Sequence, residues 1–261
     1  MTVSLGIAGS NPAAASFLTR LRSAGIETRV FGAHPGPDAE ADDPSGLRVL
    51  ILMPGDIQES EALLFESAAF ARNAPDLEAI ILSATLSPRY VRALRARISP
   101  KIALIDAPFV GSARLAEAEQ PSLLLGGDPQ EIAKLRPVLD VLGRTCTVMG
   151  GFGTAMAAKA LQDCLAAATS AMTRSAADWA EAQGIEEVRL AELLEATFGR
   201  NMPCMRDPAS LVAKALPGDN AGAVLVKNVE AALDTALAGV HLTPPRSFEE
   251  ALATIRARLL H

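Results

Sequence analysis

Short apolar, β-branched runs alternate with helical patterns through the first half of this 261-residue chain. The runs that predict strands are residues 3–9, 27–31, 48–53, 79–83, 101–105, 122–125 and 145–149. Between them, helices are predicted over 13–24, 57–72, 88–97 and 129–142, and Pro88 and Pro129 suit helix starts. Because strands that alternate with helices lie parallel, the pattern predicts a parallel sheet covered by helices.

The strand signals stop after Gly153. The helices predicted beyond it span 154–183, 187–198, 208–215, 221–238 and 247–260. We therefore predict an α/β protein: a mostly parallel sheet domain over residues 1–152, followed by a smaller all-helical domain over 153–261. The stretch 33–46 is rich in Pro, Gly and Asp, and predicts a loop where a helix normally joins two parallel strands.

Composition excludes several classes of protein. Hydrophobic residues make up 49% of the chain but aromatic residues only 4%, so an aliphatic core of helices on a sheet is expected. A net charge of -6 argues against binding to nucleic acid or anionic membranes. The three cysteines and three histidines are scattered, which predicts neither a disulfide framework nor a metal site. Because we find no signal segment or apolar run long enough to span a bilayer, we expect a cytoplasmic protein.

The segment from Gly150 to Asp163 is a glycine turn that runs into a long alanine-rich helix. Small residues around Lys159 allow a ligand or another backbone to approach closely, and Asp163 follows one helical turn later on the same face. Lys159 is therefore a candidate proton donor at the domain junction. The alternative is an ordinary ion pair between residues four apart on a helix.

Five motifs follow one another at characteristic spacing. They are Leu-Met-Pro at 52–54, Thr-Leu-Ser-Pro at 85–88, Asp-Ala-Pro-Phe-Val-Gly-Ser at 106–112, Gly-Gly-Asp at 126–128 with Pro-Val-Leu at 137–139, and the segment 150–163. Together they resemble the β-hydroxyacid dehydrogenase family, which includes 3-hydroxyisobutyrate dehydrogenase and the cofactor domain of 6-phosphogluconate dehydrogenase. The resemblance implies a Rossmann-like first domain, NAD or NADP as cofactor, and hydride transfer between the nicotinamide and a small hydroxy acid or carbonyl compound.

The same resemblance implies the catalytic and substrate-binding residues. Lys159 matches the family's general acid or base, and Asp163 stands where the family has a substrate-holding asparagine. A carboxylate there favours the ammonium form of the lysine, and hence carbonyl reduction over alcohol oxidation. The substrate-binding residues implied with them are Gly111, Ser112, Asp163 and Lys227. Ser112 as a simple turn residue and Lys227 as a solvated surface residue remain alternatives.

The cofactor site implied by the resemblance consists of Gly9, Ser10, Asn11, Pro12, Met53, Pro54 and Thr85. Where the family carries GxGxxG, this chain reads Gly-Ser-Asn-Pro-Ala-Ala over 9–14 and keeps only the first glycine. Ser10 and Asn11 offer amides and polar side chains to a pyrophosphate at a helix start. The second strand ends without the acidic residue that grips a ribose, and His34 or Arg29 are candidates for a phosphate contact.

Two functions therefore stay open. The first is an NAD(P)-dependent oxidoreductase with Lys159 as proton donor or acceptor and a small molecule as substrate. The second is a non-catalytic relative that has lost the dinucleotide and serves as a ligand-binding or dimeric scaffold. The alanine-rich helices predicted at 154–183 and 221–238 either pack a homodimer or bury each other, and a homodimer is our expectation.

Overall fold

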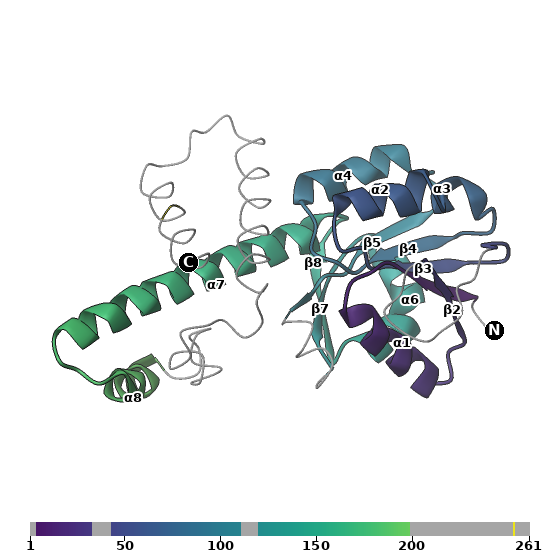
Figure 1. Ribbon diagram of the computed structural model, residues 1–261. Coiled ribbons are helices and arrows are strands. Elements are labelled where there is room, and N and C mark those ends of the chain that lie inside the picture. Colours follow the sequence, from purple (N-terminus) through teal and green to yellow (C-terminus); the bar gives the residue numbers. More distant parts are fainter. Residues whose placement is uncertain (1–3, 33–42, 111–119, 199–252, 254–261) are drawn as a thin grey trace. The chain divides into compact units, whose positions relative to one another are not determined.

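The computed structural model describes residues 4–32, 43–110, 120–198 and 253 (Figure 1). The chain divides into two compact units, Met1–Lys159 and Ala160–His261. The first unit contains the sheet. The described helices of the second unit are the greater part of α7 (Thr154–Ala182) and α8 (Glu187–Phe198). Among the described residues, no helix is both long and apolar enough to cross a membrane.

One sheet forms the centre of the first unit (Figure 1). It has eight strands in the order β2-β1-β3-β4-β5-β7-β6, with β8 also paired to β7. The strands are β1 (Leu5–Ala8), β2 (Thr28–Phe31), β3 (Val49–Leu52), β4 (Ala79–Leu82), β5 (Ala103–Asp106), β6 (Phe109–Val110), β7 (Ser122–Gly126) and β8 (Thr145–Gly150). Strands β2, β1, β3, β4 and β5 run parallel. The predicted α/β class and mostly parallel sheet are therefore confirmed.

The sheet departs from parallel pairing at β7. Asp106 in β5 pairs antiparallel with Gly126 in β7, and β6 pairs antiparallel with Ser122 and Leu123 of β7. Strand β8 then lies parallel to β7. Sequence analysis did not predict β6, because two residues are too few to show an alternating pattern.

The helices of the first unit are α1 (Ala13–Ser23), α2 (Ile57–Phe65), α3 (Phe70–Asn73), α4 (Pro88–Arg97), α6 (Pro129–Leu142) and the first part of α7. Helices α4 and α6 begin at their prolines, as predicted. The single helix predicted over 57–72 is wrong, because α2 ends at Phe65 and Ala69 takes a left-handed φ of 48° before α3. Apart from residue 253, the helices predicted at 208–215, 221–238 and 247–260 lie outside the described residues.

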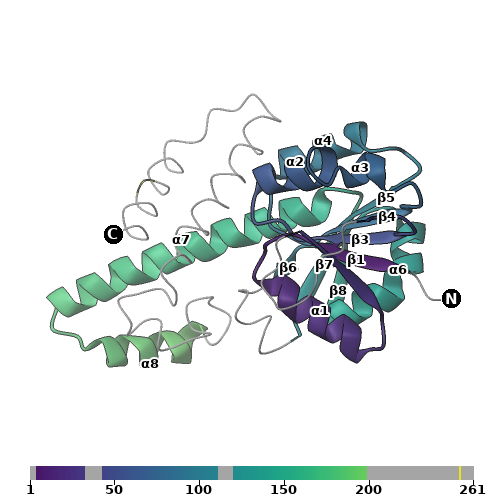
Figure 2. The ribbon, with the colours of Figure 1, turned by 45° about the vertical axis from the view of Figure 1, so that its right-hand side comes forward.

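Helices lie on both faces of the sheet (Figure 2), and a hydrophobic core fills the space on each face. Helices α1 and α6 cover one face with side chains such as Phe17 and Leu139. Helices α2, α3 and α4 cover the other, where Phe70 and Val91 are buried. Met156, in the first turns of α7, belongs to this second core and is fully buried. The start of α7 is therefore packed into the sheet domain.

Tyr90 on α4 makes the first unit sensitive to high pH. Its hydroxyl donates to Ser60 Oγ at 2.9 Å, and burial raises the pKa of Tyr90 to about 12. An unfolded phenol ionises near 10.0. The contribution of Tyr90 to the free energy of unfolding is therefore expected to be constant below that pH and to fall as the pH rises toward about 12, because only the unfolded state ionises there. Tyr90→Phe should remove this fall.

The measurement is an absorbance titration of the phenolate, which reports on Tyr90 alone because the chain has one tyrosine. Denaturant titrations of wild type and Tyr90→Phe between neutral pH and pH 11 give the matching stability curves. A phenolate midpoint at the ordinary value in the folded protein would contradict the expectation.

Candidate functional site at the carboxyl edge of the sheet

The strand order places a topological switch point between β1 and β3. Strand β2 lies on one side of β1 and β3 lies on the other, so the connections that follow β1 and β3 leave in opposite directions. Ligands of open parallel sheets bind in the crevice outside the carboxyl ends of such strands. Gly9 follows β1, Met53 follows β3 and Thr85 lies in the loop after β4, so these predicted cofactor residues share one edge of the sheet.

The β1–α1 turn requires a glycine at position 9. Gly9 has a φ of +119°, and a Cβ built on it would lie 2.2 Å from the carbonyl oxygen of Met53. The Asn11 amide donates to that same carbonyl oxygen at 3.0 Å. This hydrogen bond links the turn after β1 to the loop after β3 at the switch point. The one glycine that the chain keeps from GxGxxG is therefore the one that lets the two loops touch.

Asn11 replaces the second glycine of that motif with a side-chain turn. Its Oδ1 accepts from the Ala13 amide at 3.0 Å, and its carbonyl oxygen accepts from the Ala14 amide at 2.9 Å. Pro12 takes helical angles directly before α1 and has no N–H to donate. The amides of residues 11, 13 and 14 are thus all used within the protein itself.

Glu59 of α2 binds the remaining donors of this corner. Its Oε1 accepts from the Ser10 amide at 2.7 Å, while its Oε2 accepts from the Ser10 hydroxyl and the Gly55 amide, both at 2.6 Å. We define Ser10, Gly55 and Glu59 as the switch-point corner. In this structure the amides of Ser10 and Asn11, which sequence analysis assigns to a pyrophosphate, already have acceptors within the protein.

Sequence reasoning missed Glu59, although a signal was present. Asp56 begins α2 and its carboxylate accepts from the Glu59 amide at 2.9 Å. An N-cap residue followed three positions later by glutamate is a capping box, in which the glutamate reaches back toward the helix start. Here the glutamate reaches past the N-cap to Gly55 and across to the β1–α1 turn.

The end of β2 carries no ligand for a phosphate among the described residues. Arg29, a candidate for that contact, donates to the carbonyl oxygens of Ser45 and Asp43 at 2.8 and 2.6 Å, and its guanidinium lies 5.0 Å from the ring centre of Phe31. Arg29 therefore holds the loop before β3. The other candidate, His34, lies outside the described residues.

Asp106 at the end of β5 binds the start of α7. It is fully buried, and its two carboxylate oxygens accept from the Gly153 amide at 2.7 Å and the Met156 amide at 2.6 Å. Burial raises the pKa of Asp106 above its ordinary value, while the backbone N–H groups act in the opposite direction. A Cβ on Gly126 would lie 2.2 Å from Asp106 Oδ1, so only glycine fits opposite this carboxylate.

Lys159 lies one turn beyond Met156 on α7 and is 6% exposed. The Leu86 amide donates to Met156 Sδ at 3.3 Å, which ties the loop containing Thr85 to the same turn of the helix. The buried amine of Lys159 therefore belongs to the first unit. It lies one helical turn after the residues of α7 whose amides donate to Asp106. Its placement agrees with the inward lysine that the sequence predicted.

The other predicted residues fall in three groups. Met53 and Pro54 are buried beside the switch point, and Thr85 is half-buried. Asp163 is 5% exposed on α7, within the second unit. Gly111, Ser112 and Lys227 lie outside the described residues.

The family model for the NAD binding domain of 6-phosphogluconate dehydrogenase matches residues 21–151, which is half of the chain. The chain belongs to this family. The match covers the sheet unit from the end of α1 to β8, and the resemblance drawn from the five motifs is confirmed. Of the strands whose carboxyl ends form the site, β3, β4 and β5 lie within the matched residues, whereas β1 and the turn after it precede them.

Two curated relatives and one solved structure are similar to this chain. Mitochondrial 3-hydroxyisobutyrate dehydrogenase of Drosophila melanogaster is 32% identical over 119 residues, which are 45% of this chain and 37% of the relative. NAD-dependent L-serine dehydrogenase of Pseudomonas aeruginosa is 27% identical over 161 residues, 61% of this chain and 54% of the relative. The alignments thus span between about a third and about half of these relatives.

The solved structure is 3-hydroxyisobutyrate dehydrogenase of Mycobacterium tuberculosis with L-serine. It has a TM-score of 0.78 and 21% sequence identity, and the match covers 98% of this chain and 94% of that one. At this identity the likeness shows the fold, and it confirms the Rossmann-like prediction for this member of the 6-phosphogluconate dehydrogenase NAD-binding family.

Proposed function

We propose that the protein is an NAD(P)-dependent oxidoreductase that transfers hydride between nicotinamide and a small hydroxy acid or carbonyl compound. The observation that carries the proposal is the buried amine of Lys159, on a helix whose start Asp106 holds against the carboxyl edge of the sheet. Membership of an NAD-binding family and relatives named as dehydrogenases support it.

Lys159 acts as the general acid in the direction of reduction. The ammonium group gives a proton to the carbonyl oxygen while the carbonyl carbon gains a hydride, and the neutral amine is then reprotonated from solvent. Gly111, Ser112, Asp163 and Lys227 are proposed to bind the substrate.

The residues proposed to hold the dinucleotide are Gly9, Ser10, Asn11, Pro12, Met53, Pro54 and Thr85. The corner around Ser10 and Gly55 fits an anion, because its two amides and one hydroxyl converge on the carboxylate of Glu59. When bound, the nicotinamide supplies or accepts the hydride. The choice between NAD and NADP is open, since neither a ribose carboxylate nor a free arginine follows β2 among the described residues.

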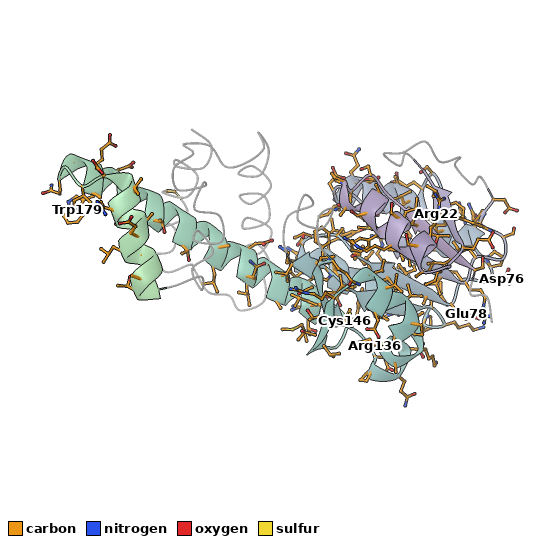
Figure 3. The ribbon with its side chains drawn as sticks, turned by 90° about the horizontal axis from the view of Figure 1, so that it is seen from below. Arg22, Asp76, Glu78, Arg136, Cys146 and Trp179 are labelled. Atoms are coloured by element: carbon orange, nitrogen blue, oxygen red, sulfur yellow. The ribbon has the colours of Figure 1, made fainter. Side chains whose placement is uncertain are left out.

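Cofactor binding is expected to raise the melting temperature of the purified protein. At about 100 times its Kd, a dinucleotide adds roughly 2.7 kcal/mol to the free energy of unfolding. Trp179 is 67% exposed on α7 (Figure 3), so its emission is a weak reporter and thermal unfolding is the better readout. Adenosine at equal concentration is the control.

Turnover is tested by following NADH or NADPH absorbance with a panel of small 2-oxo and 3-oxo acids, and the reverse reaction with 3-hydroxyisobutyrate and L-serine. Reduction of one member with one cofactor is expected. The proposal fails if no nicotinamide dinucleotide shifts the melting temperature at millimolar concentration and no member is turned over.

A second candidate function is a non-catalytic scaffold that binds a small ligand or forms a dimer. The contacts of Glu59 with Ser10 and Gly55 favour it, because they fill the corner that a phosphate needs. It predicts unchanged cellular function when Lys159 is replaced by alanine in a folded protein. A cytoplasmic homodimer remains part of both proposals.

A further inference from the structure

The switch-point corner is arranged around a negative charge. Two backbone N–H groups and one hydroxyl, from two different loops, donate to one carboxylate at 2.6 to 2.7 Å. Short hydrogen bonds to an ionised acceptor are about twice as strong as those between neutral groups. Carboxylate and phosphate oxygens compete for the same kind of donor set, since both are anions that bind backbone N–H groups.

The rest of the β1–α1 turn cannot supply these donors. The amides of Asn11, Ala13 and Ala14 donate to carbonyl or side-chain oxygens of the turn itself or of Met53, the residue after β3, and Pro12 has no amide hydrogen. Releasing any of these amides would open the turn or the first turn of α1. Releasing Ser10 and Gly55 needs only one side chain to move, and the hydrogen bonds of that side chain are exposed.

We propose that the carboxylate of Glu59 is a built-in competitor of the dinucleotide's phosphates, so that Glu59 weakens cofactor binding and leaves the corner when cofactor enters. This inference rests on the proposed function, because it concerns the same site. The reason is electrostatic as well as steric: the pyrophosphate and the carboxylate carry the same sign of charge and need the same three donors.

The decisive variant is Glu59→Gln, which keeps the size of the side chain and removes its charge. It is expected to lower the Kd for NAD⁺ or NADP⁺ by about tenfold or more. The neutral glutamine binds the donors of the corner less strongly than the carboxylate does, so the phosphates of the cofactor displace it more easily. The matched control is Glu66→Gln, which removes one negative charge from an exposed residue directly after α2. It should leave the Kd within about twofold of wild type.

Binding is measured by titration calorimetry at fixed ionic strength, with NAD⁺, NADP⁺ and inorganic pyrophosphate as probes. Melting temperatures confirm that each variant is folded. Pyrophosphate reports on the corner without any contact to adenosine or nicotinamide. Tighter binding by Glu59→Gln of a dinucleotide and of pyrophosphate supports the inference, including the case in which wild type binds neither.

Other outcomes overturn it in distinguishable ways. Equal Kd values for wild type and Glu59→Gln overturn the inference and leave the proposed function standing. Weaker binding by Glu59→Gln also overturns it, since Glu59 then supports cofactor binding instead of opposing it. Absence of dinucleotide binding in wild type, Glu59→Gln and Glu59→Ala at millimolar concentration overturns both the inference and the proposed function.

Discussion

Replacing Lys159 by methionine is expected to lower kcat for carbonyl reduction by about 10²- to 10⁴-fold, which is the range for a positioned general acid. Methionine has a similar length and no proton to donate, and the site is only 6% exposed, so water has little access to take over the role. Steady-state kinetics with the active substrate and a saturating cofactor measure the loss. The Kd of the cofactor should change little.

Two further variants distinguish the loss of the proton donor from the loss of a positive charge and from effects on folding. Lys159→Arg keeps a positive charge but does not release a proton in the physiological range, so its kcat should fall nearly as far. Lys101→Met removes an exposed lysine after α4 and should leave kcat unchanged. Activity of Lys159→Met within tenfold of wild type would rule out the general-acid role.

Replacing Asp106 by alanine is expected to lower the free energy of unfolding of the sheet unit by about 2 to 4 kcal/mol. The substitution leaves the Gly153 and Met156 amides without their acceptor in a buried place, and each unsatisfied buried donor costs about 1–3 kcal/mol. Urea denaturation followed by far-ultraviolet circular dichroism gives the value. Asp140→Ala, at an exposed ion pair with Arg136, should cost less than about 0.5 kcal/mol.

The pH dependence of this carboxyl follows from its burial. Because the folded pKa of Asp106 lies above the ordinary value of 3.8, the folded state holds the proton more tightly than the unfolded state. The contribution of Asp106 to stability is therefore greatest below pH 3.8 and declines as the pH rises to the folded pKa. Asp106→Asn should lack this decline. If the free energies of unfolding of wild type and Asp106→Asn change in parallel across acidic pH, the expected decline is contradicted.

Much of the sheet unit follows from local patterns. The seven predicted strands each overlap an observed one. Strands β1, β3 and β4 are buried, continuous apolar runs that stand out between polar loops, whereas the largely exposed β8 was found from its β-branched and apolar residues. The starts of α4 and α6 followed from proline, whose fixed φ suits the first helical position. Membership of the family followed from the order of five motifs rather than from any single one.

What the sequence did not reveal depends on contacts between distant segments. The break between α2 and α3 lies at Ala69, whose left-handed φ no propensity favours. The hydrogen bonds of Glu59 to the β1–α1 turn join residues 49 positions apart, so no window along the chain contains both partners. The use of Asp106 as the cap of a helix nearly 50 residues away is hidden for the same reason.

The glycine opposite Asp106 has a consequence for how this protein can change over evolution. A Cβ at position 126 would lie 2.2 Å from the carboxylate and 2.9 Å from the backbone carbonyl oxygen of Gly151. A lineage that gains a side chain at 126 must therefore both lose the acid at 106 and shift the backbone before α7. We expect the double substitution at 106 and 126 to relieve only part of the penalty of changing the glycine alone.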